Sequence, residues 1–262
     1  EFSARRININ MFGQNKIICI AGKNECAIQF VKFISSIIPK RNILILTNKS
    51  DNGKDNWQPS LKKFARKNKY KLTKINNLYT IDNLIFISIE YESIINIDKF
   101  LSKELFNFHF SLLPKYRGCH TNFFQIYNGE KISGVTLHKI DNGIDTGPII
   151  DQIKFSINKN SNAFKNYKFL MKTSVKLLKK NFKKILNYHY KTRKQKLEYG
   201  SYYSRKSVDY EKMKYFNLTK LNMKHFNRIK AFIFPPLQLP LLNNKKISDI
   251  KFVNNNFKII YD

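Results

Sequence analysis

Two short apolar runs near the start of the chain limit the folds that it can adopt. Residues 16–22 read KIICIAG and residues 42–47 read NILILT, and apolar side chains recur at helical spacing across residues 24–38 between them. Buried strands on either side of a helix are typical of a parallel sheet, because parallel strands need a long crossover connection. A third run, residues 82–89, is apolar enough for a central strand. The sequence therefore predicts an α/β protein with a Rossmann-like parallel sheet.

The side chains best suited to chemistry lie between residues 106 and 145. Asn107 and His109 alternate with phenylalanines, so they share one face of a predicted strand. Asp145 lies in the glycine-punctuated loop DNGIDTG. An imidazole can move a proton, and a carboxylate can orient that imidazole and stabilise its charged form. An amide N–H can donate to a developing oxyanion. These three residues are therefore the predicted catalytic group of an acyl transfer without a covalent intermediate.

Metal chemistry is the competing interpretation of this stretch. Asparagine is a poor zinc ligand, and no His or Cys partner lies at ligand spacing, so we expect no metal. His138 alternates within a strand predicted over residues 134–140, and we interpret it as a structural histidine with satisfied hydrogen bonds.

The runs HFSLLPKYRG and NGEKISGVTLHKIDNGIDTGPII closely resemble the folate-dependent formyltransferases, over about residues 84–153. Asn107, His109 and Asp145 match that family's catalytic trio in type, order and approximate spacing. The resemblance implies 10-formyltetrahydrofolate as the formyl donor and no metal. Ligands of open α/β sheets bind at the carboxyl ends of the strands, which makes the loop at 90–96 a candidate wall of the folate pocket. The predicted folate-binding residues are Glu90, Tyr91, Leu113, Asp141, Gly143 and Gly147.

Two subgroups of that family fit the chain less well. The turn after the first predicted strand, AGKNE, lacks the phosphate loop of a glycinamide-ribotide formyltransferase. It also lacks the G-T-P-x-F-A run that usually opens a methionyl-tRNA formyltransferase, and it contains no dinucleotide or P-loop motif. The pattern RKS-D at 205–209 and the run IKAFIFPP at 229–236 resemble the nucleotide-sugar N-formyltransferases instead. That subgroup implies a dTDP-linked amino sugar as acceptor and a product for a bacterial surface glycan such as lipopolysaccharide O-antigen.

The segment at 228–240 is the predicted wall of the nucleotide site. Its prolines at 235, 236 and 240 predict that it forms neither a helix nor a central strand. Exposed phenylalanines could stack on a pyrimidine, and cationic side chains could hold a diphosphate. A core β-ribbon with its lysines outside stays open as an alternative. The predicted substrate-binding residues are Arg117, His120, Asn122, Arg228, Lys230, Phe232 and Phe234.

The predicted organisation has three parts. Residues 1–10 precede Met11 and are interpreted as a leader or an expression remnant, and residues 11–188 form the catalytic domain. That domain ends in a long amphipathic helix over 161–188, with an apolar stripe and a lysine-rich face. Residues 189–262 form a small C-terminal subdomain that closes with a β-hairpin.

Charge and composition bear on partners and location. The chain carries 48 Lys and Arg against 18 Asp and Glu, a formal net charge of +30. A nucleic-acid partner and a compositional bias spread along the chain both explain this charge, and we favour the bias. No apolar run is long enough for a membrane span, and three cysteines without metal spacing suit a cytoplasmic protein. A homodimer is compatible with the sequence. The alternative functions are a methionyl-tRNA formyltransferase-like enzyme and a non-catalytic binding protein on the same scaffold.

Overall fold

A computed structural model describes residues 15–262, so the leader predicted for residues 1–10 lies outside the described residues. The chain folds as two compact units that alternate along the sequence. The first runs to Phe108 and also includes Leu178–Thr192. The second comprises His109–Leu177 and Arg193–Asp262. The predicted division into residues 11–188 and 189–262 stays a prediction.

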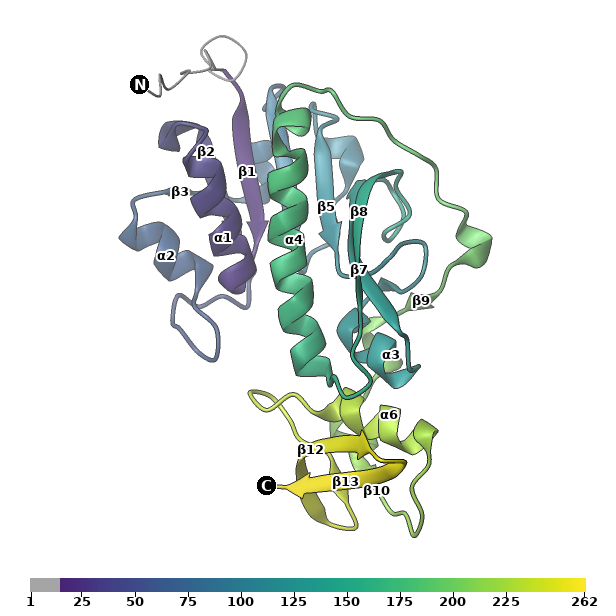
Figure 1. The fold of residues 1–262 in the computed structure, drawn as a ribbon. Helices are drawn as coiled ribbons and strands as arrows, with labels where there is room; N and C mark the ends of the chain where they lie inside the picture. Colours follow the sequence, from purple (N-terminus) through teal and green to yellow (C-terminus); the bar gives the residue numbers. More distant parts are fainter. Residues whose placement is uncertain (1–14) are drawn as a thin grey trace, which may run out of the picture. The chain divides into compact units, whose positions relative to one another are not determined.

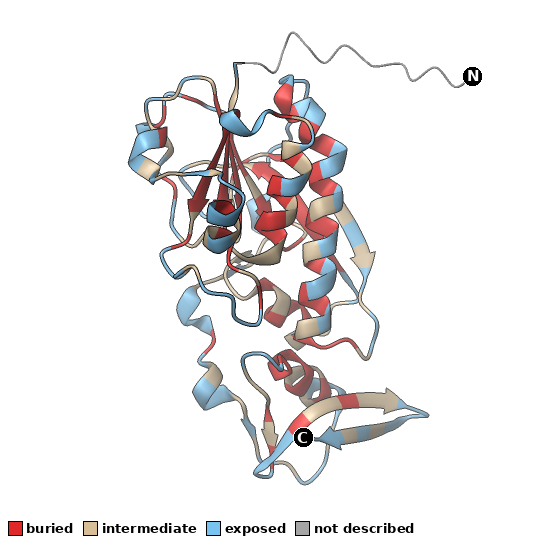
Figure 2. Ribbon diagram, turned by 90° about the vertical axis from the view of Figure 1, so that its left-hand side faces the viewer, coloured by how far each residue is buried: buried red, intermediate tan, exposed pale blue. Residues whose placement is uncertain are grey.

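The first unit contains a parallel sheet with the strand order β3-β2-β1-β4-β5 (Figure 1). The five strands are β1 (Ile17–Gly22), β2 (Ile43–Thr47), β3 (Lys71–Leu72), β4 (Leu84–Ile89) and β5 (Leu105–His109), whose last residue begins the second unit. All six residues of β4 are buried, and Figure 2 colours the central strands of this sheet red. Continuous apolar runs are typical of strands covered on both faces. The predicted α/β fold with a large parallel sheet is confirmed.

The helices of the first unit follow the predicted pattern closely. Helix α1 (Asn24–Ser35) buries Phe30, Val31 and Ile34, and α2 (Leu61–Lys67) begins at the N-cap Ser60, whose side chain accepts from the Lys63 N–H. Helix α1 ends before the predicted residue 38, since Ile38 precedes a proline and such residues disfavour helical dihedral angles. Short 3₁₀ turns occupy Lys40–Asn42, Ile75–Leu78 and Ile97–Lys99.

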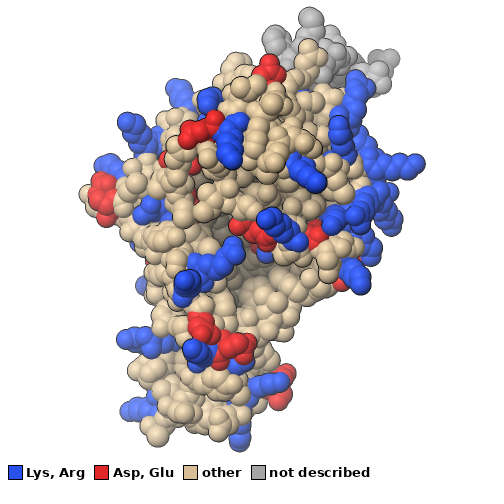
Figure 3. Space-filling view, turned by 180° about the vertical axis from the view of Figure 1, so that it is seen from behind, with Lys and Arg blue, Asp and Glu red and all other residues tan. Residues whose placement is uncertain are grey.

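Helix α4 (Ala163–Leu186) is the long amphipathic helix that the sequence predicts. Its residues up to Leu177 belong to the second unit and the rest to the first. Its exposed residues are Phe169 and eight lysines, Lys165, Lys168, Lys172, Lys176, Lys179, Lys180, Lys183 and Lys184. On the face of the molecule shown in Figure 3, basic side chains are scattered with acidic ones among them. None of the helices formed by residues 15–262 has the length and hydrophobicity needed to traverse a bilayer.

The second unit contains an antiparallel pair of strands and a small mixed sheet. β7 (Ile132–Lys139) pairs with β8 (Ile149–Ser156), and the loop between them carries Asp145. The mixed sheet has the order β10-β11-β12-β13, and its last two strands form the predicted terminal hairpin. The other strands are β6 (Arg117–Gly118), β9 (Tyr202–Tyr203), β10 (Tyr215–Phe216), β11 (Leu241–Leu242), β12 (Lys245–Val253) and β13 (Asn256–Tyr261). Its helices are α3 (Thr121–Tyr127), α5 (Tyr210–Met213) and α6 (Met223–Phe232), with 3₁₀ turns at Leu197–Tyr199 and Arg205–Ser207.

One prediction for the second unit is wrong. The prolines at 235, 236 and 240 were expected to exclude a helix over residues 228–240, yet α6 extends to Phe232. A proline restricts its own residue and the one before it, so Pro235 permits a helix that ends at Phe232. The side chain of Asn222 caps this helix by accepting from the His225 N–H at 2.9 Å.

Candidate active site

The carboxylate of Asp145 is the centre of the candidate site. Oδ2 lies 3.4 Å from Nδ1 of His109, and Oδ1 lies 3.5 Å from Nε2 of His138. The backbone N–H of Gly118 donates to Oδ2 at 2.9 Å. The side chain of Asp145 is only 12% exposed. A nearly buried carboxylate therefore sits between two imidazoles and one backbone donor, all within the second unit.

Opposing effects act on the protonation of Asp145. Burial acts to raise its pKa, because desolvation disfavours the charged form. The neighbouring His109 and His138 and the N–H of Gly118 outweigh burial and hold the pKa of Asp145 well below the usual range of an aspartate. The carboxylate is therefore ionised at neutral pH and can stabilise positive charge on an adjacent ring.

The ring of His109 is held from both sides. Its Nε2 lies 2.7 Å from the carbonyl oxygen of Tyr116, and its Nδ1 faces Asp145. A carbonyl oxygen only accepts, so Nε2 carries a proton in this contact. The contact with Tyr116 thus fixes the orientation of the ring and leaves Nδ1 as the nitrogen that faces Asp145.

Gly118 has a local reason to be glycine. Its φ of +86° lies in the left-handed region, and a Cβ added there would lie 2.3 Å from the carbonyl oxygen of Tyr203. The close approach comes from the pairing of β6 with β9, in which Gly118 is opposite Tyr203. Glycine thus allows the turn to present its N–H to Asp145.

The loop that carries Asp145 is held by its own side chains. The Asp141 carboxylate accepts from the Thr146 hydroxyl at 2.7 Å and from the Gly143 N–H at 3.2 Å. A Cβ at Gly147 would lie 1.9 Å from the carbonyl oxygen of Lys139, so the loop closes tightly against β7. Within the protein alone, Asp141, Gly143 and Gly147 therefore shape the loop, and their predicted role toward folate stays a prediction.

Asn107 lies on β5, opposite Ser88 of β4 in the first unit. It is half-buried and stands two residues before His109 in the same strand. Residues two apart in a strand point to the same face, so the strand geometry agrees with the predicted pairing of amide and imidazole.

The predicted folate-binding residues Glu90 and Tyr91 follow directly after β4. Asn48 holds this loop, because its amide donates to the Glu90 carbonyl at 2.9 Å and accepts from the Glu92 N–H at 3.2 Å. Leu113 lies in the second unit with its side chain buried, and its backbone bonds to Thr136 and Gln152. The contacts of Asn48 thus hold the loop after β4 in place at the end of that strand.

Three of the predicted acceptor-binding residues lie at 117–122. Both ring nitrogens of His120 lie at hydrogen-bond distance from a partner. They lie 3.1 Å from the hydroxyl of Tyr210 and 2.9 Å from the Arg205 carbonyl oxygen. Arg117 is half-buried on β6, and its Nε has no hydrogen-bond partner within residues 15–262. Asn122 is half-buried on α3. The contacts of His120 thus join the turn after β6 to the segment that carries Arg205 and to α5.

The expectation that Phe232 and Phe234 form an exposed wall is wrong. Phe232 is 1% exposed and Phe234 is 6% exposed. Phe232 packs edge-on against Phe123, with ring centroids 4.9 Å apart, and Phe234 packs on Phe164 at 5.0 Å. Both positions therefore serve the apolar core, as the alternative interpretation had it, although on a helix and its end instead of a β-ribbon.

The two cations of that segment are also largely enclosed. Lys230 is buried, and its ammonium donates to the Lys159 carbonyl at 2.5 Å. Burial, and to a lesser degree the charge of Lys159, lower the pKa of Lys230 to about 8. Arg228 is half-buried over the ring of Tyr127. These positions show no open diphosphate cradle.

The sequence interpretation missed two partners of the site. His138 was predicted to be a structural histidine with satisfied hydrogen bonds, and its Nδ1 lies 2.7 Å from the Lys139 carbonyl oxygen; the contact of its Nε2 with the Asp145 carboxylate was not predicted. Its place on a strand seven residues before Asp145 is a signal that could have found it. The Tyr116 carbonyl that orients His109 carries no such signal, because any residue type provides a carbonyl.

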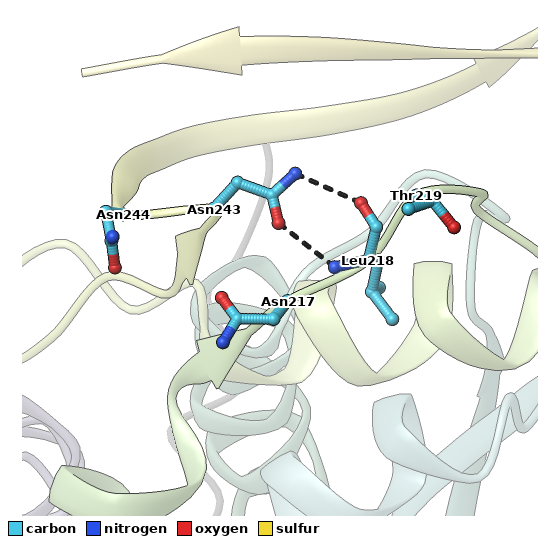
Figure 4. Close-up of a pocket in the computed structure, with 5 residues that line it drawn as sticks. All are labelled: Asn217, Leu218, Thr219, Asn243 and Asn244. Atoms are coloured by element: carbon cyan, nitrogen blue, oxygen red, sulfur yellow. Dashed lines mark hydrogen bonds between the residues drawn. The ribbon is translucent and has the colours of Figure 1, made fainter.

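A surface pocket elsewhere in the second unit contains none of these residues (Figure 4). It is lined by Asn217, Leu218, Thr219, Asn243 and Asn244. The Asn243 amide bonds to both the N–H and the carbonyl of Leu218 at 3.0 Å, so its polar atoms stabilise the turn. Within residues 15–262, no group of three or more His, Cys, Asp or Glu is placed to hold a metal ion.

Comparison with known proteins shows the family of this chain. The family described as formyl transferase matches residues 85–180. The structure is similar to that of WlaRD, a sugar 3N-formyl transferase crystallised with dTDP and 5-N-formyl-THF, with a TM-score of 0.87. The two are 44% identical, and the match covers 91% of this chain and 87% of WlaRD. This chain belongs to the formyl transferase family. The resemblance predicted from residues 84–153 is thereby confirmed.

Two further family members differ in their acceptors. An N-formyltransferase from Helicobacter canadensis, solved with folinic acid and dTDP-3-aminofucose, is 40% identical over 91% of this chain and 88% of its own, with a TM-score of 0.86. A methionyl-tRNA formyltransferase of Thermodesulfovibrio yellowstonii is 35% identical over 161 residues, which are 56% of this chain. The match covers 52% of that curated relative, so the chain spans about half of its length.

Proposed function

We propose that this formyl transferase family member moves a formyl group from 10-formyltetrahydrofolate to the amine of a dTDP-linked amino sugar. The observation that carries the proposal is the ionised, nearly buried Asp145 carboxylate beside the His109 ring, on a family scaffold. An imidazole with a fixed negative partner suits the transfer of an amine proton. This arrangement argues against a non-catalytic binding protein on the same scaffold.

Each residue of the catalytic trio has a defined role in this proposal. As the acceptor amine attacks the formyl carbon, His109 takes the amine proton at Nδ1, because Nε2 already holds a proton toward Tyr116. Asp145 stabilises the imidazolium so formed. The Asn107 amide donates to the formyl oxygen as that oxygen gains negative charge. His109 then returns the proton to the folate nitrogen that leaves.

Each of the two loops predicted to contact the donor has a fixed backbone. When bound, 10-formyltetrahydrofolate supplies the activated formyl carbon. A pterin ring presents donors and acceptors along its edges, and sites for such ligands provide a few fixed polar groups. The loop after β4 is pinned by Asn48, and the loop before β8 is pinned by Asp141. Glu90, Tyr91, Leu113, Asp141, Gly143 and Gly147 remain the proposed contact residues.

The acceptor class rests on the similarity to sugar enzymes. Both solved relatives crystallised with dTDP or a dTDP-sugar match this chain over 91% of its length. Of the predicted acceptor residues, Arg117 and Asn122 are half-buried in the turn and helix that follow His109, and they remain proposed contacts. We also propose that the enzyme acts in the cytoplasm of a bacterium and that its product enters a surface glycan.

Methionyl-tRNA is the second candidate acceptor. The net charge of +30 and the similarity to methionyl-tRNA formyltransferases favour it. A protein that neutralises several phosphates loses about 10³–10⁵ in affinity between roughly 50 and 200 mM salt. A sugar-nucleotide site with one diphosphate depends far less on salt.

The test is a direct acceptor comparison. The purified protein is incubated with 10-formyltetrahydrofolate and, separately, with dTDP-3-amino and dTDP-4-amino sugars, GDP- and UDP-amino sugars and initiator methionyl-tRNA. Mass spectrometry detects the added formyl group. We expect formylation of a dTDP-amino sugar and little salt dependence. Formylation of the tRNA alone, with a steep salt dependence, would replace this proposal with the second candidate.

A further inference from the structure

We propose that Gln195 is a positioning residue of the active site: it sets the backbone from which Asp145 reaches the two histidines. The inference rests on the proposed function, because it assigns the orientation of the Asp145 carboxylate to a side chain on a different segment. Gln195 lies 50 residues beyond Asp145, after α4.

Asp145 has a backbone conformation that needs support. Its φ of 54° lies in the left-handed region, which disfavours residues with a Cβ. Such a conformation persists only where the surrounding structure holds it. The bonds of Asp141 within the loop reach Gly143 and Thr146 and leave the backbone of Asp145 itself to other contacts.

Gln195 provides such contacts. Its Nε2 donates to the Asp145 carbonyl at 2.9 Å and to the Gly147 carbonyl at 2.7 Å. The two acceptors belong to the peptide units 145–146 and 147–148, so the bonds fix the backbone on both sides of the Thr146–Gly147 segment that follows Asp145. The Oε1 atom of Gln195 is buried and has no hydrogen-bond partner among residues 15–262, so these two carbonyls alone orient the amide.

The segment that carries Gln195 is itself held in register. Two residues earlier, Arg193 and Ile149 exchange backbone hydrogen bonds of 2.8 Å each, and the Arg193 guanidinium donates to Gln152. Ile149 and Gln152 belong to β8, directly after the Asp145 loop. The start of the segment is thus fixed to the strand, and Gln195 reaches back over the loop.

The contact also explains the residue type. Two carbonyl oxygens require two N–H donors in one group, and an amide of this length provides both. A glutamate has the same shape but places one acceptor oxygen where Nε2 faces both carbonyls, so Gln195→Glu replaces two attractions with repulsion. Gln195→Met keeps the volume and removes the donors without adding charge.

The test is a double-mutant cycle on turnover. A misplacement of about 1 Å near the reacting groups can cost about 100-fold, and we expect a loss of that order in kcat for Gln195→Glu. Because Gln195 acts through Asp145, the same change made on top of Asp145→Asn should cost less than about twofold. Lys194→Ala, an exposed neighbour on the same segment, is the matched control and should leave turnover unchanged. Turnover of Gln195→Glu within about twofold of the parent, or a fully additive double loss, overturns the inference.

Two further measurements keep the outcome decisive. If Gln195→Glu does not fold, Gln195→Met takes its place in the cycle with the same expectations. The histidine ring signals in NMR spectra provide a readout without turnover, since the chain has only five histidines. In the variant at Gln195, the NMR signals of His109 and His138 should move in the direction seen for Asp145→Asn. Unchanged signals contradict the inference. If the parent protein transfers no formyl group, the proposed function is wrong. The NMR comparison still decides the role of Gln195 in that case.

Discussion

The single variant Phe232→Ala tests whether Phe232 is a core residue or a residue that stacks on the nucleotide. Phe232 is 1% exposed and contacts the rings of Phe123, Tyr210 and Phe216. Truncation of a buried phenylalanine to alanine removes its burial energy and leaves a cavity, which together cost about 3–5 kcal/mol. With a urea slope of about 3 kcal/mol per molar, the unfolding midpoint of Phe232→Ala should fall by about 1–1.7 M.

The assay combines urea unfolding, followed by circular dichroism, with KM measurements on the folded variant. A base-stacking role would raise the KM for the nucleotide sugar about five- to 150-fold, since such contacts are worth about 1–3 kcal/mol. Burial predicts that this KM changes by less than about twofold. The control is Leu237→Ala, five residues later and 62% exposed, which should change stability by less than about 0.5 kcal/mol. A stable Phe232→Ala with a strongly raised KM would refute the reasoning.

Two further predictions concern charge. Asp145→Asn should reduce kcat about 10²–10⁴-fold. The fold holds the pKa of Asp145 below its usual value of about 3.9, so its ionised form stabilises the parent above about pH 4, and this stabilisation is lost as the pH falls. Asp145→Asn should remove that pH-dependent stabilisation. Acid titrations of stability for both proteins check this, and parallel curves contradict it. The pKa of Lys230 is lowered to about 8 in the folded protein, below its value of about 10.4 in the unfolded chain. Between these two pH values the unfolded chain binds more protons at this lysine, so the parent gains stability as the pH rises through that range. Lys230→Met should abolish that rise in melting temperature, and an unchanged rise would assign it to another group.

The first unit could be predicted almost entirely from its apolar runs. β1, β2 and β4 are short, mostly apolar runs rich in Ile, and a strand buried on both faces leaves that pattern. β8 was not predicted, because only Ile149 among its residues is buried and the strand shows no apolar run. The part of α6 from Arg228 to Phe232 was not predicted, because the prolines at 235, 236 and 240 were taken to exclude a helix over the whole segment at 228–240.

The chemistry of the site could be predicted, but its supports could not. His109 and Asp145 stand out by type and by the motifs around them, and the structure brings them within 3.4 Å. Gly118 and Gln195 act through contacts with residues 27 and 50 positions away in sequence. Such pairings are set by how the chain folds back over the loop, and no local pattern encodes them.

The turnover of His109→Asn on a dTDP-amino sugar tests the central claim most directly. The account makes His109 the group that carries the amine proton, and loss of general acid–base catalysis costs about 10²–10⁴-fold. We predict a fall in kcat of that size, with the melting temperature and the binding of dTDP and folate near those of the parent. A variant that folds, binds both ligands and turns over within about threefold of the parent would contradict the account.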